Sequence, residues 1–179
     1  MSPNWCNGSV KVKGNPEDIK GFCRLFVFET EDFESVIWGD EYFARSFMNM
    51  RWEDFEKRYL TGGDNVTFPV MFAWSCYSCI IEGYPNGEYK VTLPYACKKF
   101  NVNVEIETEE EMLGFEEKVK CSETGELSYE SVHMEIYKCS KCGNKQFVAT
   151  SYELEGVDCD ECGCNKWELV KDNKGGEIK

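Results

Sequence analysis

The chain has 179 residues, of which 42% are hydrophobic and 15% aromatic, so it can form one domain of ordinary size with a small addition. Its 20 basic and 33 acidic side chains give a net charge of −13. That charge disfavours wrapping a nucleic-acid backbone, because cationic side chains drive phosphate binding. No apolar stretch is long enough to span a membrane, and no apolar run follows a basic flank near the start. We therefore expect a cytoplasmic protein without a membrane segment or a secretory signal.

The N-terminal part of the sequence predicts a strand followed by a helix. The run 4–13 alternates valines with lysines, which is typical of a half-buried strand. Asn15 can cap a helix, and Pro16 suits the first helical position, where no backbone N–H is needed. The apolar spacing predicts that this helix extends as far as Val27.

Further strands and short helices follow, and their order predicts the fold class. The strand expected at 65–74 alternates most clearly, and Pro69 within it predicts an exposed backbone edge or a bulge. The acidic run Glu107–Glu111 is expected to end the strand before it. The other expected elements are a strand at 42–50, helices at 52–60 and 93–100, and strands at 102–106, 115–121 and 127–137. We predict an α+β fold with an antiparallel sheet and helices on one face.

The composition changes near residue 134, which predicts two domains and a tail. Residues 1–133 are expected to form the α+β domain, and residues 134–171 carry paired cysteines and form a small second domain. Residues 172–179 are polar with two glycines and are expected to be a disordered tail.

Cysteine chemistry dominates the candidate sites. The chain has eleven cysteines and one histidine, His133, for which we expect no role beyond its strand. An odd cysteine count without an export signal favours metal binding over a disulfide framework. A single histidine also leaves little scope for triads or histidine general bases.

Two C-x-x-C-G units, separated by sixteen residues, form the most specific motif in the chain. Zinc prefers four soft ligands in a tetrahedron, and each such turn presents two thiolates to one ion. We predict a zinc ribbon with one structural Zn²⁺ and with further strands at 146–154 and 167–170. The four predicted ligands are Cys139, Cys142, Cys159 and Cys162. Such a site leaves no water to activate, and Cys164 is expected to stay outside it.

The opening Pro3-Asn4-Trp5-Cys6-Asn7 resembles the start of the YubB ferredoxin-like family of phage and plasmid proteins. Members of that family begin P-N-W-C-x-N before an alternating strand, and Gly8 stands here at the second asparagine. Phe72–Ser75 resembles the family's strand ending in W-S-P-P, with Cys76-Tyr77 in place of the prolines. Glu110–Phe115 resembles the acidic segment before the family's last hairpin.

The resemblance covers about residues 2–127 and implies a ferredoxin-like β-α-β-β-α-β sheet, to which the ribbon is appended. It implies no particular chemistry. In such a sheet the first and third strands are adjacent, so it also implies that Cys6, Cys76 and Cys79 lie together beside Trp5 and Trp74. This thiol cluster can be a buried corner, a redox pair at Cys76 and Cys79, or a second metal site.

Three functions are compatible with these features. The first, which we favour, is a non-enzymatic, zinc-stabilised protein-interaction module of a phage or mobile element. The second is an acidic inhibitor that mimics nucleic-acid charge against a host defence or replication protein, and the third is a thiol redox protein using Cys76 and Cys79. No phosphate loop, nucleophile elbow or paired metal carboxylates are visible. We expect another protein, with a basic surface, as the partner, and expect neither nucleic acid nor membrane to bind.

Overall fold

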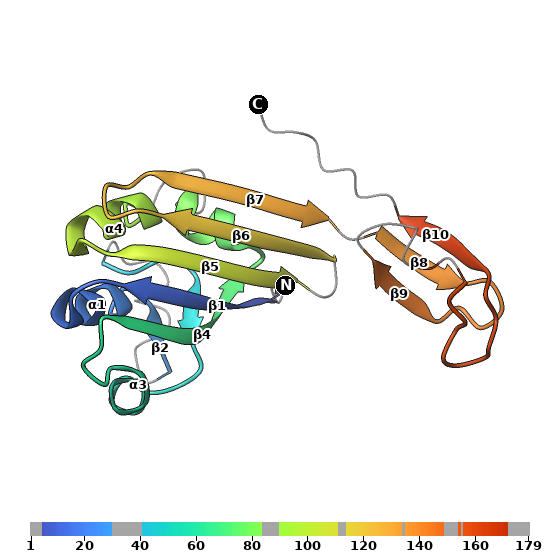
Figure 1. The fold of residues 1–179 in the computed structure, drawn as a ribbon, viewed down its shortest axis with the longest axis horizontal. Helices are drawn as coiled ribbons and strands as arrows, with labels where there is room; N and C mark the ends of the chain where they lie inside the picture. Colours follow the sequence, from blue (N-terminus) through green and yellow to red (C-terminus); the bar gives the residue numbers. More distant parts are fainter. Residues whose placement is uncertain are drawn as a thin grey trace. The chain divides into compact units, whose positions relative to one another are not determined.

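The computed structural model describes residues 5–29, 41–83, 90–110, 114–133, 135–148, 154 and 156–171 (Figure 1). The chain divides into two compact units. The first comprises Met1–Glu110 and Glu117–Glu130, and the second comprises Glu111–Glu116 and Ser131–Lys179. The expected tail and the first two residues of the opening motif lie outside the described residues. None of the helices within the described ranges is both long and apolar enough to cross a membrane.

The larger sheet has seven strands in the order β2-β3-β4-β1-β5-β6-β7. Its strands are β1 (Trp5–Lys13), β2 (Val27–Phe28), β3 (Ser46–Met48), β4 (Asn65–Ala73), β5 (Asn103–Glu110), β6 (Phe115–Cys121) and β7 (Leu127–His133). The helices between them are α1 (Pro16–Cys23), α3 (Trp52–Tyr59), the short π-helix η1 (Tyr77–Ile81) and α4 (Leu93–Phe100). Strand β1 is central and runs antiparallel to both of its neighbours, β4 and β5.

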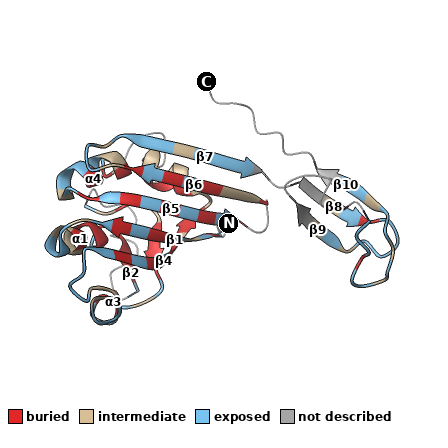
Figure 2. Cartoon of the chain, in the orientation of Figure 1, coloured by how far each residue is buried: buried red, intermediate tan, exposed pale blue. Residues whose placement is uncertain are grey.

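Side chains alternate between a buried and an exposed face along the central strands (Figure 2). On β1, Val10 and Val12 are fully buried, whereas Lys11 and Lys13 are exposed. Aromatic packing joins the buried face to the helices, since Phe68 of β4 lies 5.1 Å from Phe55 of α3 between ring centroids. The predicted α+β class is confirmed, because alternating strands bury one face against amphipathic helices. The sheet is not wholly antiparallel as predicted, since β2 and β3 pair in parallel.

Helix α1 begins as predicted and ends early. The Asn15 side chain accepts the Glu17 N–H at 3.2 Å, which is the N-cap interaction. The predicted extension to Val27 is wrong. After Cys23 the helical hydrogen bonds give way to turn hydrogen bonds, such as the one from Phe26 N–H to Cys23 O at 3.2 Å. Val27 then begins strand β2. Apolar spacing could not separate these alternatives, because the turn and the strand are buried as well.

Two strand predictions need correction, and one of two alternatives at Pro69 is excluded. The strand expected at 42–50 is only Ser46–Met48, since Arg45 has a φ of 52° and cannot extend it. At Pro69 the β1–β4 register runs unbroken, which excludes a bulge, and β3 pairs with β4 only at Met71 and Phe72. The acidic run does not end β5, which continues to Glu110 with Glu109 paired opposite Asn7 of β1. Glu107 and Glu109 take exposed positions on the strand, so their charges stay in water and destabilise it little.

The second unit contains a three-stranded antiparallel sheet in the order β10-β8-β9. Its strands are β8 (Glu135–Cys139), β9 (Lys145–Val148) and β10 (Trp167–Lys171). The strand expected at 127–137 is therefore two strands, β7 and β8, on either side of residue 134. The closing strand is confirmed, whereas β9 ends at Val148, and residues 149–153 of the expected strand lie outside the described residues.

Candidate metal centre

The four predicted zinc ligands lie together in the second unit. The sulfurs of Cys139, Cys142, Cys159 and Cys162 are all within 4.8 Å of one another. Cys139 Sγ lies 3.5 Å from Cys162 Sγ, and Cys142 Sγ lies 3.6 Å from Cys159 Sγ. A zinc–sulfur bond of about 2.3 Å in a tetrahedron places sulfurs about 3.8 Å apart. The spacing therefore fits one tetrahedral zinc and is far longer than a disulfide bond.

The two cysteine turns have matching backbone geometry. Gly143 N–H donates to Cys139 O at 2.9 Å, and Gly163 N–H donates to Cys159 O at 2.7 Å. The φ angles of these glycines are 76° and 66°, a left-handed conformation that glycine adopts without steric cost. Cys139 ends β8, so the sheet fixes the first turn. The glycine after each C-x-x-C is what lets both pairs of thiols converge.

The electrostatics of this site are compatible with a bound cation. Donation from the backbone N–H of Cys142 lowers the pKa of the Cys139 thiol to about 6. Cys162 also receives a backbone N–H, from Cys164, but burial and the neighbouring sulfurs raise its pKa to about 12. The four thiols therefore cannot all ionise in isolation, and a divalent ion would supply the missing positive charge. An all-sulfur donor set of this geometry suits Zn²⁺, which would hold the ribbon together with no open coordination position.

Cys164 does not join the four ligands. Its sulfur lies 3.7 Å from Ser140 Oγ, and its carbonyl accepts the Cys159 N–H at 2.9 Å. Its contribution to the turn is thus made through the backbone.

The other predicted thiols, Cys6, Cys76 and Cys79, lie around a carboxylate that the sequence analysis did not single out. Glu117 of β6 is 1% exposed. Its Oε2 accepts the Cys76 N–H at 2.7 Å, and Cys6 Sγ lies 3.7 Å from the same oxygen. Cys79 Sγ instead donates to Ala73 O at 3.2 Å. The sequence did carry a signal for a buried Glu117. In the alternating strand 115–121, Glu117 lies on the same face as the buried Val119 and Cys121.

Glu117 accepts three further hydrogen bonds. Its Oε1 receives the Tyr77 N–H and the Tyr129 hydroxyl, both at 3.1 Å, and its Oε2 receives the Thr108 hydroxyl at 3.0 Å. One carboxylate thereby joins the start of η1 to strands β5 and β7. Trp5 and Trp74, which were expected beside these thiols, lie at the same end of the β1–β4 pair. Trp5 pairs with Ala73, and Trp74 is the next residue along the chain.

This environment disfavours thiolates at the cluster. Burial raises the pKa of both Cys6 and Cys79 to about 12, with the Glu117 charge a further cause in each case. Burial also raises the pKa of Cys76 well above its ordinary value. Within the described ranges, the ribbon cysteines are the one set of side chains with metal-ligand spacing.

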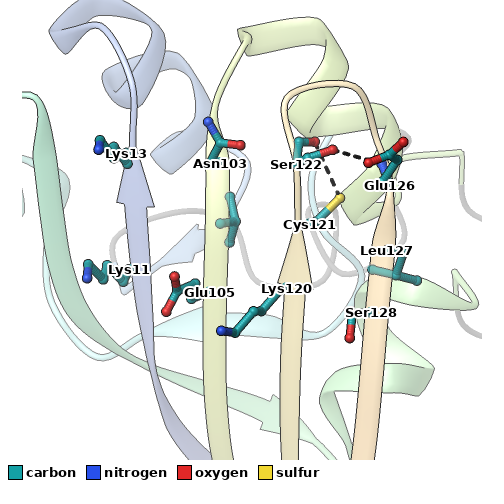
Figure 3. Close-up of a pocket in the computed structure, with 11 residues that line it drawn as sticks. Lys11, Lys13, Asn103, Glu105, Lys120, Cys121, Ser122, Glu126, Leu127 and Ser128 are labelled. Carbon is teal, nitrogen blue, oxygen red and sulfur yellow. Dashed lines mark hydrogen bonds between the residues drawn. The ribbon is translucent and has the colours of Figure 1, made fainter.

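The exposed face of the sheet carries both signs of charge. A groove of about 510 Å³ crosses it (Figure 3), and its lining includes Lys11, Glu105 and Lys120. Lys11 pairs directly opposite Glu105 in the β1–β5 register, and Ser9 pairs opposite Glu107. Among the exposed carboxylates of β5, Glu105 therefore has a lysine opposite it, whereas Glu107 and Glu109 lie opposite the uncharged Ser9 and Asn7.

Comparisons of the chain with protein-family models, with curated proteins and with solved structures found no match. The fold and the site alone define the class, which is a sheet-rich α+β protein with a four-cysteine module compatible with zinc.

Proposed function

We propose that this protein is a non-enzymatic protein-interaction module in which one structural Zn²⁺ holds the C-terminal ribbon. The observation that carries the proposal is the convergence of four cysteine sulfurs within 4.8 Å. A unit with three short strands buries little apolar surface, so metal binding would supply much of its folding free energy. Four protein ligands leave no metal-bound water, which argues for a structural ion.

We further propose that the larger sheet has a ferredoxin-like core related to the YubB family of phage and plasmid proteins. The position of β1 between β4 and β5, antiparallel to both, supports this proposal. One departure from the family motif has a structural counterpart. A β-carbon on Gly8 would lie 2.4 Å from Glu107 O and 2.6 Å from Thr108 Cγ2, so the family's asparagine would not fit here without a backbone shift.

Binding is favoured over turnover because the thiols of the Cys6 cluster are held protonated and the metal site has no open position. We propose another protein as the partner, with basic groups that meet the exposed glutamates Glu107 and Glu109 of β5. Lys11 opposite Glu105, together with Lys120 in the same groove, favours specific docking over general mimicry of nucleic-acid charge, since these lysines interrupt a single-sign field.

Metal analysis tests the zinc site. Protein purified without chelator should contain one equivalent of zinc, and Cys142→Ser should lose most of it, because a lost ligand weakens the metal's coupling to folding. Cys164→Ser is the matched control, since its sulfur lies outside the ligand set, and it should keep the full equivalent. Less than about half an equivalent in the unmodified protein would contradict a structural site.

A further inference from the structure

Two cysteines far apart in the sequence meet in the core beneath the exposed groove. Cys97 lies in α4 and Cys121 ends β6, and the two are 0% and 2% exposed. Cys97 Sγ lies 4.0 Å from Cys121 O, so α4 places this thiol directly against the residue that carries the second thiol. All eleven cysteines are free thiols in the structure, so Cys97 and Cys121 are a pair of neighbouring free thiols.

The two thiols are electrostatically unequal. Hydrogen bonding from the Cys97 thiol lowers the pKa of Cys121, and the Lys98 ammonium lowers it further, while burial opposes both. The same hydrogen bond, together with burial, raises the pKa of Cys97. A more acidic thiol beside a protonated one is the arrangement of an attacking and a resolving cysteine.

Local structure holds the Lys98 cation at this site. The turn between β6 and β7 contains Gly125, whose φ is 81°. A β-carbon there would lie 2.4 Å from Lys98 Cε, so the lysine stem occupies the space that a side chain would take. The glycine therefore serves both the turn and the approach of the cation.

The groove of Figure 3 offers an anionic reagent a route to Cys121. Cys121 is part of the groove wall, together with three lysines that have no ion pair within the described residues. These are Lys11, Lys13 and Lys120. Two carboxylates, Glu105 and Glu126, also line the groove, so its lining carries one net positive charge.

We propose that Cys97 and Cys121 form a redox-active dithiol that closes to a disulfide by exchange with an anionic low-molecular-weight disulfide such as glutathione disulfide. The Cys121 thiolate attacks one sulfur of the reagent, whose S–S bond breaks and releases one thiolate. Cys97 then gives up its proton to solvent and attacks the Cys121 sulfur of the mixed disulfide, which releases the second thiolate. Two protein thiols are thereby oxidised to one disulfide, and the reagent is reduced to two thiols.

The test equilibrates the zinc-loaded full chain with glutathione disulfide, blocks free thiols with iodoacetamide, and maps the unreduced peptides by mass spectrometry. We expect a peptide pair joined through Cys97 and Cys121. Cys97→Ser should instead accumulate glutathione on Cys121, because the resolving thiol is absent. Cys23→Ser, which removes another buried thiol on α1, should leave the crosslink unchanged. A crosslink between Cys76 and Cys79 in place of the expected one, or full alkylation of both Cys97 and Cys121 after denaturation, would overturn the proposal.

Variants that keep both thiols make the test independent of core packing. Lys98→Met should slow crosslinking severalfold, since it removes the cation beside the Cys121 sulfur. Lys120→Gln should slow the reaction with glutathione disulfide and leave that with uncharged hydroxyethyl disulfide unchanged. Equal rates for Lys98→Met and the unmodified protein would contradict the assigned attacking thiol. These results do not depend on zinc content, so failure here is distinct from failure of the ribbon proposal.

Discussion

Replacing Glu117 by glutamine tests whether one buried carboxylate organises the end of the sheet. The amide keeps the shape of the side chain but converts one accepting oxygen into an N–H donor. Hydroxyl donors such as Thr108 and Tyr129 can rotate and accept instead. The backbone N–H groups of Cys76 and Tyr77 cannot rotate, and each faces a different oxygen of Glu117. Either orientation of the amide therefore leaves one backbone donor without an acceptor, either the buried Cys76 N–H or the part-buried Tyr77 N–H.

That loss sets the magnitude of the effect. An orphaned buried donor costs about 1–3 kcal/mol, and the remaining bonds weaken when the acceptor loses its charge. We expect Glu117→Gln to lower the unfolding free energy by about 2–4 kcal/mol, and Glu117→Ala by about 3–5 kcal/mol, because both backbone donors are then orphaned.

Urea unfolding followed by tryptophan fluorescence measures this change. With a slope of about 2 kcal/mol per molar urea, the glutamine variant should unfold at a midpoint at least about 1 M lower. Glu109→Gln is the matched control, since Glu109 is exposed on β5, and it should change stability by less than about 0.5 kcal/mol. Equal midpoints for the two variants would refute the assigned role of Glu117.

Two further predictions concern the same unit. Gly8→Ala should destabilise this unit by about 2 kcal/mol or more, because the added β-carbon would lie 2.4 Å from Glu107 O. The control Gly63→Ala should leave the urea midpoint unchanged, because the nearest atom to its added β-carbon is 3.7 Å away. Stability should also fall as the pH rises from 9 towards 12, because burial raises the pKa of Cys6 and Cys79 from 9.0 to about 12, and the unfolded chain releases these protons first. Cys79→Ala should make that decline shallower, and an unchanged pH slope would count against the assignment.

The sequence by itself determined the features that depend on local spacing. The C-x-x-C-G units specified the four ribbon ligands, because a tight turn brings its two thiols together whatever surrounds it. The N-cap at Asn15 and the alternation of 65–74 likewise specified the start of α1 and the extent of β4. These signals are local, since a cap or a period-two pattern acts over a few residues.

Tertiary structure decided where nonlocal groups meet. In the sequence, Glu117 is one of several acidic residues in a charged stretch. Only the pairing of β6 with β5 brings its carboxylate within hydrogen-bond distance of Cys76 N–H and the Thr108 hydroxyl. Cys97 and Cys121 are 24 residues apart, and they meet because α4 packs against the sheet. The acidic run of β5 shows the same limit, since its glutamates were expected to break a strand that sheet pairing extends. Contacts between distant segments depend on register and packing, which no local pattern in one sequence encodes.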